Sequence, residues 1–463
     1  MCKVLLIKPR SGKYKFWEDK YAWLGLAYIS ATLNENKITA EIIEASPGRK
    51  KELCGLLARE RPEFVGISVM TVNYKTALKI SELCKKFDSK IRIVLGGPHI
   101  CLDICKLLPA FIDFAVIGEG ELAMLALVKS VSSGEEPRKV GGLFYRWAGE
   151  IKFNPPFLLE DIDKIPMPHP YIDYRKYRTT DYPSRFRRDS AFVLTARGCP
   201  NRCNFCSIVS AFGHKIRFHS VGRVIREIEY LKQQGIKSIR FIDPTFNLDS
   251  DRTLKLCRAL GEINIEWACY THVNKMDLNT MSLFRKTGCT LVSYGIESAS
   301  QDILNGADKG ITPLAAMRAT QAAQQAGLKT FGFFVIGLPQ ETYATALQTV
   351  EYANRLELDY ALFLIATPFP GTELYRAAKE KKYIQSFDWD LYFASIFDNT
   401  PIMKTDALDL KGVKEVVKIV YKRYYLNPKN IMRAFSRLNL GHLGMALHGL
   451  PLLFGKRSTL KHN

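Results

Sequence analysis

Short runs of β-branched and other apolar residues alternate with longer helical patterns through most of the 463-residue chain. This alternation predicts parallel strands joined by crossover helices, because parallel neighbours cannot be joined by a tight hairpin. One such series precedes residue 146, and a second follows residue 189. The sequence therefore predicts an α/β protein with two parallel-sheet domains.

The first series predicts five strands and the helices between them. The strands are expected near residues 4–7, 40–44, 64–68, 91–95 and 114–117. Helical patterns cover residues 24–34, 74–87 and 121–131. Residues 1–145 should therefore form a doubly wound, Rossmann-like sheet, whose ligands bind beyond the carboxyl ends of its strands.

The rest of the chain divides into a connector, a second sheet and a terminal region. Residues 146–189 lose the periodicity and gather prolines, which indicates a linker that packs along one or both domains. Residues 190–380 contain six strand-helix units, which predict an open, partial (β/α)6 barrel, since a closed barrel needs eight. Its strands are expected near residues 191–196, 238–242, 265–270, 290–294, 330–336 and 360–366. Residues 381–463 are basic and helical in character.

Composition gives little information about where in the cell the protein acts and which partners it binds. The amino terminus reads MCKVLLIKPR and shows no signal sequence, so we expect a cytoplasmic protein. The formal net charge of +20 is spread along the whole length, which favours a generally basic surface over a nucleic-acid site. The apolar stretch 440–454 is short for a membrane span. It is expected to pack against the barrel, with a peripheral membrane contact as the alternative.

Three cysteines lie close together just after the first strand of the second series. Cys199, Cys203 and Cys206 occur in TARGCPNRCNFCS. Thiolates at this spacing on a loop can reach three corners of an iron-sulfur cube, with Phe205 shielding the cube from water. A structural zinc site would need a fourth ligand, which His214 or His219 could supply. Most other cysteines sit singly in apolar segments and are expected to be packing residues.

This cysteine pattern, with an aromatic residue before the last cysteine, is similar to the signature of the radical S-adenosylmethionine (SAM) superfamily. The resemblance implies a [4Fe-4S] cluster whose fourth iron binds SAM. It also implies an electron donor such as flavodoxin or ferredoxin, and reductive cleavage of SAM to methionine and a 5′-deoxyadenosyl radical.

Two later segments, YGIES at residues 294–298 and IGLPQET at residues 336–342, resemble strand motifs of the same family. They imply that Glu297 and Ser298 contact the SAM ribose or amino acid part, and that Gly337 lies near the adenine. Asp243 and His272 are further candidates for SAM contacts. The segments around them, FIDPTFN and YTHVN, depart from the pattern of many relatives, which leaves the SAM carboxylate contact open.

Loops of the first series resemble the SxL and GG elements of cobalamin-binding domains. The resemblance implies that cobalamin contacts a set of residues after the third, fourth and fifth strands. They are Ser68, Met70, Thr71, Gly96, Gly97, Pro98, His99, Gly118, Glu119, Gly120 and Glu121. The DxHxxG element is missing, since Lys20 and Ala22 take the places of Asp and His. This implies a base-off, His-off cobalamin, with His99 as a loop or tail contact and not a cobalt ligand.

Other interpretations of the first domain are weaker. No GxGxxG follows the first strand, which argues against a dinucleotide site. Cys101 and Cys105 could form a redox pair on one helix face, but packing is favoured.

Together the two resemblances indicate a cobalamin-dependent radical SAM enzyme of the methyltransferase type. Such an enzyme methylates an unactivated carbon, or less often phosphorus, of a small-molecule, lipid or peptide substrate. The main alternative keeps both cofactors but catalyses an oxidative cyclisation or rearrangement without methyl transfer. A methylthiotransferase and a cobalamin sensor are the remaining alternatives.

Overall fold

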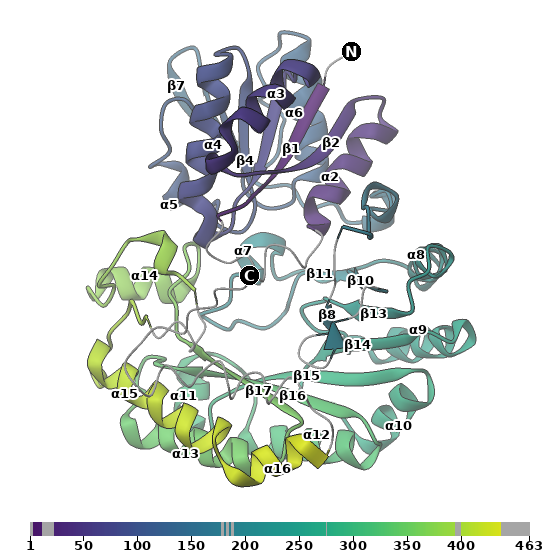
Figure 1. Ribbon diagram of the computed structural model, residues 1–463, viewed down its shortest axis with the longest axis vertical. Coiled ribbons are helices and arrows are strands. Elements are labelled where there is room, and N and C mark those ends of the chain that lie inside the picture. Colours follow the sequence, from purple (N-terminus) through teal and green to yellow (C-terminus); the bar gives the residue numbers. More distant parts are fainter. Residues whose placement is uncertain are drawn as a thin grey trace.

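A computed structural model describes residues 3–11, 23–176, 180–181, 185–186, 189–274, 276–393 and 400–436. In Figure 1 the first domain lies above the barrel sheet, and the short helix α7 (Ile208–Phe212) lies between them. The two domains therefore face each other across the region that contains the cysteine loop.

The first sheet has seven strands in the order β2-β1-β3-β4-β5-β6-β7. The first five strands of the chain run parallel, as predicted. They are β1 (Lys3–Pro9), β2 (Thr39–Ala45), β3 (Phe64–Ser68), β4 (Arg92–Gly96) and β5 (Phe114–Val116). The order and the parallel direction of these strands confirm the predicted doubly wound sheet.

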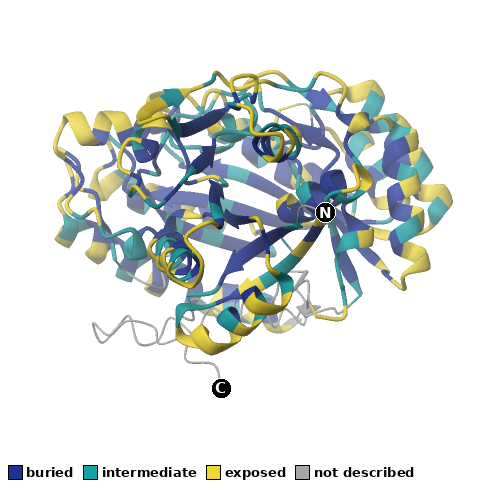
Figure 2. Cartoon of the chain, turned by 90° about the horizontal axis from the view of Figure 1, so that it is seen from above, coloured by how far each residue is buried: buried dark blue, intermediate teal, exposed yellow. Residues whose placement is uncertain are grey.

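Helices cover both faces of this sheet. On one face α2 (Leu24–Glu35) and α6 (Glu121–Ser132) bury their apolar residues in one core cluster. On the other face α3 (Lys50–Glu60), α4 (Tyr74–Phe87) and the short α5 (Leu102–Cys105) contribute to a second cluster. Figure 2 shows the buried strands running through the middle of the molecule, with exposed residues on the outer helices.

The sheet continues past residue 145, where the sequence had indicated the start of a linker. β6 (Leu143–Trp147) and β7 (Glu150–Phe153) form an antiparallel hairpin on the edge next to β5. Ala148 and Gly149 make its two-residue turn with φ of 50° and 83°, the left-handed values that such a turn requires. Phe153, not residue 145, is thus the last residue of the first sheet.

The second sheet has six parallel strands in the order β10-β13-β14-β15-β16-β17, which confirms the partial barrel. Its strands are β10 (Ser190–Val193), β13 (Ser238–Phe241), β14 (Glu266–Thr271), β15 (Cys289–Glu297), β16 (Lys329–Ile336) and β17 (Tyr360–Ile365). Its helices are α8 (Val221–Gln233), α9 (Ser250–Ile263), α10 (Leu278–Lys286), α11 (Gln301–Gly306), α12 (Pro313–Gln325), α13 (Tyr343–Arg355) and α14 (Glu373–Glu380). Side chains on the outer face of the strands pack against most of these helices in one large core.

The described part of the terminal region packs against the barrel. α15 (Leu410–Val420) and the π-helical turn Tyr421–Tyr425 bury valine and tyrosine side chains in the barrel core. The hydroxyl of Tyr425 donates to the carbonyl of Ala361 at 3.1 Å. α16 (Pro428–Ser436) follows. Residues 440–454 lie outside the described residues, and no described helix is long and apolar enough to cross a membrane.

The connector packs along both domains. Ile162 and Ile165 share a small core with Tyr28 of the first domain and Leu194 of the second. Further along, His169 Nε2 lies 2.6 Å from Glu227 Oε1 on α8. These contacts tie the connector to elements on each side of it.

Most cysteines outside the triplet are packing residues. Cys84, Cys101, Cys105, Cys257, Cys269 and Cys289 are buried and Cys54 is half-buried, while Cys2 lies outside the described residues. Burial raises the pKa of the Cys105 thiol to about 12, and it raises the pKa of Cys101 as well. Such thiols are poor nucleophiles, which argues against a redox pair.

Candidate functional site

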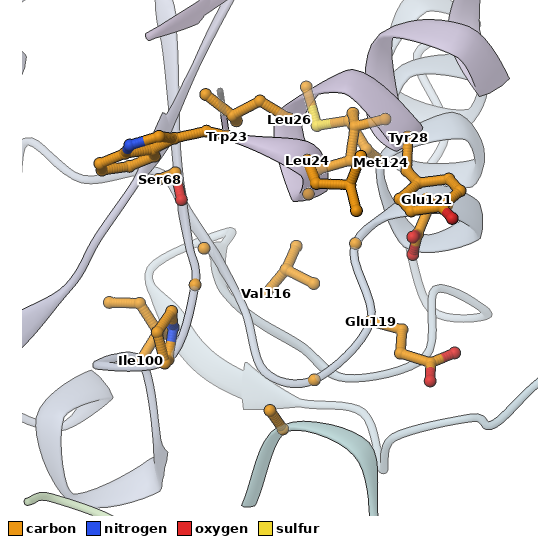
Figure 3. A pocket seen from close by; sticks show the side chains of 18 of the residues that line it. Trp23, Leu24, Leu26, Tyr28, Ser68, Ile100, Val116, Glu119, Glu121 and Met124 are labelled. Atoms are coloured by element: carbon orange, nitrogen blue, oxygen red, sulfur yellow. The ribbon is translucent and has the colours of Figure 1, made fainter. Parts of the chain in front are cut away.

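A cavity of about 540 Å³ lies between the two domains, which we call the interdomain cavity. Loops at the carboxyl ends of β3, β4 and β5 line one side of it, and β10 and α7 line the other. Figure 3 shows Trp23 and Ser68 on one side of this cavity and Tyr28, Glu119 and Glu121 on the opposite side. The site therefore lies where ligands bind in doubly wound sheets.

Most of the residues that the cobalamin resemblance named line this cavity. They are Ser68, Met70, Gly96, Gly97, Pro98, Gly118, Glu119, Gly120 and Glu121. Thr71 and His99 are not among its lining residues. Lys20 and Ala22 lie outside the described residues. No histidine is among the described residues that line the cavity.

Glycine backbone forms part of the cavity wall. Gly97 has φ of 102°, and a Cβ atom there would lie 2.8 Å from both the amide nitrogen and the carbonyl oxygen of Val69. Gly120 could not hold a Cβ atom without moving Ile29, whose Cδ1 would be 2.8 Å away. These positions therefore need glycine because the loops pack closely against the Val69 backbone and the Ile29 side chain. An apolar chamber with bare backbone along one wall fits a bulky, flat ligand such as a corrin.

His99 lies beside the cavity in a separate buried cluster. Its Nδ1 is 3.2 Å from Thr71 Oγ1, and its ring lies between Tyr74 and Trp389, with centroids 4.6 and 5.0 Å away. Burial lowers the pKa of His99 to about 3, so the ring is neutral at physiological pH. Trp389 belongs to the chain segment after the barrel, so His99 and Thr71 help to join the domains.

A two-stranded antiparallel ribbon forms the base of the cysteine loop, with one strand before the loop and the other after it. β11 (Ala196–Arg197) pairs with β12 (Arg217–Phe218), and α7 lies on the loop between them. Gly198 starts the loop with φ of 87°, and a Cβ atom there would come within 2.1 Å of the Lys215 carbonyl oxygen. The amide of Cys199 donates to the carbonyl of Gly213 at 3.2 Å, and that of Cys206 donates to Cys203 at 3.1 Å. The three cysteines are thus held on one short loop at the edge of the barrel.

The thiols are half-buried beside a cation. Burial raises the pKa of the Cys203 thiol to about 11 and that of Cys206 too, while the nearby Lys309 ammonium opposes both shifts. Phe205 packs against apolar residues after the fifth and sixth barrel strands, and Lys309 Nζ lies 6.0 Å from its ring centroid.

Zinc fits this loop poorly. No three His, Cys, Asp or Glu side chains in the described residues come close enough to hold a single metal ion. Thiolates of an iron-sulfur cube each bind a different iron, so they need not converge on one point. His219 lies 1% exposed with its Nδ1 2.9 Å from Asp163 Oδ1, in contact with the connector. The donor set therefore fits a cluster better than zinc.

Glu297 and Lys309 form a charged pair at the end of β15. Lys309 Nζ donates to Glu297 Oε1 at 2.6 Å, with both side chains mostly buried. Gly295 makes room for them, since a Cβ atom there would lie 2.5 Å from Glu297 Oε1 and 2.7 Å from Lys309 Nζ. Glu297 itself adopts φ of 65°. Lys309 lies in the loop after α11, where no motif indicated it, so sequence reasoning missed this residue.

Ser298 and Gly337 lie on the neighbouring turns. Ser298 is fully buried, and its Oγ is 3.2 Å from Thr349 Oγ1. The amide of Gly337 donates to the Glu341 carboxyl group, whose Oε1 has no hydrogen-bond partner in the described part of the chain. Burial raises the pKa of Glu341 to about 8, against the effect of the Gly337 hydrogen bond. A buried, unpartnered carboxyl oxygen at this turn fits a polar ligand group.

Asp243 and His272 have contacts within the protein. Asp243 accepts hydrogen bonds from the amide and hydroxyl of Thr195, both at 2.5 Å, and from the amide of Ala196 at 3.1 Å. Burial raises its pKa to about 6 in spite of these bonds. The His272 amide donates to Asn247 Oδ1 at 2.9 Å. Asp243 thus fixes the entry to the cysteine loop.

Two family models match the chain. The radical SAM superfamily model matches residues 193–353, and the B12 binding domain model matches residues 18–128. These ranges cover the cysteine loop with most of the barrel, and the loops of the first sheet that line the cavity.

Relatives match over both domains. An uncharacterised methyltransferase of Pyrococcus horikoshii is 33% identical over 419 residues, which cover 89% of each chain. An anaerobic magnesium-protoporphyrin IX monomethyl ester cyclase of Rubrivivax gelatinosus is 30% identical and covers 81% of this chain and 68% of its own.

Among solved structures, the radical SAM methyltransferase TsrM from Kitasatospora setae, with cobalamin and a [4Fe-4S] cluster bound, has a TM-score of 0.72. It covers 91% of both chains at 19% identity, so it shows the shared fold. The relatives and the family models identify the chain as a member of the radical SAM superfamily that carries a B12-binding domain, with a [4Fe-4S] cluster, SAM and cobalamin as its cofactors.

Proposed function

We propose that this enzyme transfers a methyl group from SAM to an unactivated carbon, or less often phosphorus, of a small-molecule, lipid or peptide substrate. The observation that carries the proposal is the interdomain cavity. Ser210, four residues after Cys206 on α7, lines the same chamber as Gly96 and Gly97 of the first domain. A methyl carrier in this chamber and a radical made at the cysteine loop would both reach one substrate. A methyltransferase among the closely matching relatives supports the same assignment.

We assign Cys199, Cys203 and Cys206 as the ligands of three irons, which leaves the fourth iron for SAM. When bound, the cluster supplies one electron to SAM, from a donor protein of the flavodoxin or ferredoxin type. Phe205 then limits water at the cluster, because its ring packs against an apolar cluster of the barrel next to the cysteine loop.

The Glu297–Lys309 pair has the charges needed for the amino acid part of SAM. That part carries one ammonium and one carboxylate, and the pair offers one carboxylate and one ammonium in a mostly buried position. We therefore assign Lys309 to the SAM carboxylate and Glu297 to the ammonium, which supplies the contact that FIDPTFN and YTHVN left open. We place Ser298, Gly337 and Glu341 near the nucleoside part, where Glu341 Oε1 offers an unused hydrogen-bonding atom.

A cyclisation or rearrangement without methyl transfer is the second candidate. It is favoured by the Rubrivivax gelatinosus cyclase, which is 30% identical over 392 residues. A methylthiotransferase would need a second group of three cysteines in the first domain. The described cysteines there, Cys54, Cys84, Cys101 and Cys105, form no such group that could hold a metal ion.

Methyl transfer can be tested without the natural substrate. Anaerobic enzyme is given hydroxocobalamin, SAM and a low-potential chemical reductant, and both nucleoside products are measured. A methyltransferase should form S-adenosylhomocysteine, which requires the cobalamin, together with 5′-deoxyadenosine. Deoxyadenosine alone, at equal levels with and without cobalamin, would favour the cyclase alternative.

Replacement of Cys203 by alanine should abolish the visible charge-transfer absorbance of the reconstituted cluster and most of its bound iron. The reason is that two thiolates hold a cube poorly. Cys54→Ala is the control, because Cys54 lies half-buried on α3 in the other domain. Equal iron content in the two variants would contradict the assignment.

The backbone of Gly97 should be essential for cobalamin. Gly97→Ala introduces a Cβ atom 2.8 Å from the Val69 backbone, so the loop must move and cobalamin affinity should fall by about tenfold or more. Gly134→Ala is the matched control. Gly134 also has a positive φ, 78°, but no atom lies within 4 Å of the position that its Cβ atom would take. Retention of cobalamin on anaerobic gel filtration measures the difference, and similar losses in both variants would point to general destabilisation.

Lys309→Gln should weaken SAM binding about tenfold or more, because a charge-assisted hydrogen bond of about 1.5–3 kcal/mol is lost. Equilibrium dialysis of radiolabelled SAM against cluster-loaded enzyme measures the effect. Lys329→Gln, at an exposed lysine where β16 begins, should bind SAM like the unmodified enzyme. An unchanged SAM affinity in Lys309→Gln would remove this lysine from the site.

A further inference from the structure

Two arginines lie opposite each other in the ribbon that closes the cysteine loop. In the antiparallel pairing of β11 with β12, Arg197 is the register partner of Arg217. Both residues are almost fully buried, at 1% and 3% exposure. Like charges directly opposite on neighbouring strands repel, and burial strengthens the repulsion. The ribbon therefore needs counter-charges from elsewhere in the chain.

The first domain supplies them. Glu121 Oε1 accepts from Arg197 Nη2 at 2.6 Å, and Glu119 Oε1 accepts from Arg217 Nη2 at 2.5 Å. Glu119 Oε2 also accepts from Arg217 Nη1 at 3.0 Å and lies 3.4 Å from Arg197 Nη1. The two carboxylate side chains are each 7% exposed, so two positive and two negative charges are buried together. We call these four residues the charge clamp.

The charge clamp is also part of the cavity wall. Glu119, Glu121 and Arg197 line the interdomain cavity, together with Tyr28 and Phe212, whose rings lie 5.1 and 5.8 Å from Arg197 Cζ. Figure 3 shows Glu119 and Glu121 on the same side of the cavity as Tyr28. Arg197 is two residues from Cys199 in the chain. The same side chains therefore face a ligand in the cavity and hold the base of the cysteine loop.

Three donors of the clamp are buried and have no hydrogen-bond partner in the part of the chain that the structure describes: Arg197 Nε, Arg197 Nη1 and Arg217 Nε. Arg197 is the one of these two arginines that lines the cavity. Amide side chains surround the rim of a corrin, and their carbonyl oxygens are suitable acceptors for the Arg197 donors. A corrin in the cavity would also exclude water from the clamp, and its charge pairs become stronger in a drier site.

We propose that the charge clamp couples the two cofactor sites, so that cobalamin in the cavity stabilises the cluster on the cysteine loop. Glu119, Glu121, Arg197 and Arg217 are then positioning residues that touch neither the cluster nor the reacting atoms. The proposal rests on the cofactor sites assigned under the proposed function. Because coupling between two binding sites is reciprocal, the loaded cluster also tightens cobalamin binding by the same factor.

The test measures how fast cluster-loaded enzyme loses iron to an excess of a ferrous chelator, with and without hydroxocobalamin. In the unmodified enzyme cobalamin should slow iron release about fivefold or more, the size of a typical coupling. Arg197→Lys keeps the charge but loses Nε and the forked geometry of the guanidinium group. In this variant cobalamin should slow iron release by less than about twofold. Glu119→Gln/Glu121→Gln should behave in the same way, and far-UV circular dichroism tells whether this double variant folds.

Glu160→Gln is the matched control. Glu160 pairs with Lys215, which also belongs to the cysteine loop, but both side chains are mostly exposed, at 70% and 60%. Exposed pairs contribute little, so this variant should keep the full effect of cobalamin on iron release. If the double variant does not fold, the result for Arg197→Lys alone decides whether the charge clamp couples the two cofactor sites.

Three results would overturn the coupling: an iron-release rate that does not respond to cobalamin in the unmodified enzyme, a full response in Arg197→Lys, or an equal loss of response in Glu160→Gln. Iron and cobalt contents are measured first on the same samples. Enzyme that holds neither cofactor contradicts the proposed function itself, whereas enzyme that holds both without coupling contradicts only the charge clamp. Cobalamin affinity of iron-free and cluster-loaded enzyme gives the reciprocal measurement.

Discussion

Both parallel sheets direct the carboxyl ends of their strands toward one interdomain cavity, and the chemistry depends on this shared edge. In a parallel sheet every loop that follows a strand lies at the same edge, so separate loops of the first domain come together there without any contact between their sequences. The second sheet does the same with β10 and α7. In the proposed function a radical and a methyl carrier meet within contact distance of one substrate atom, so the relative position of the two sheets would limit the proposed reaction. The connector core around Ile162 and Tyr28 is one of the features that fix this position.

Sequence patterns that repeat locally could be predicted, and contacts between distant segments could not. The eleven parallel strands and the cysteine triplet follow from periodicity and spacing within short windows. The β6–β7 hairpin was missed because Trp147 and Ile151 belong to a half-exposed edge, where the apolar pattern is weak and only the Ala148-Gly149 turn marks the reversal. Thr71 lies in a 3-10 turn at Thr71–Asn73, which the apolar pattern of the sequence does not indicate. There its hydroxyl lies against His99, and both residues are outside the cavity lining.

Overall charge gave little information because the charges with a role are buried and paired. The formal net charge of +20 adds up all lysines, arginines, aspartates and glutamates without regard to where they lie in the fold. By contrast, Glu227 on α8 is 1% exposed, and His169 of the connector contacts it. Such partners are far apart in the chain, 58 residues in this case, so no local spacing indicates them. A buried carboxylate without a partner is costly, which makes each of these pairs a strong constraint on how the connector and the barrel fit together.

Several positions in the barrel break the local rules of stable packing, and they gather at the proposed SAM site. Glu297 adopts a left-handed φ that favours glycine, and the strand pairing is shifted between Gly295 and Glu297. Lys309 is mostly buried, and Glu341 has a buried carboxyl oxygen without a partner in the described chain. Each feature costs stability on its own, and a chain selected for stability alone would have no reason to place four of them on adjacent turns. A ligand that carries both charges and a hydrogen-bonding base could pair with Glu297, Lys309 and Glu341 together, and for this reason we propose that SAM binds at the irregular end of β15 and not at a regular element of the barrel.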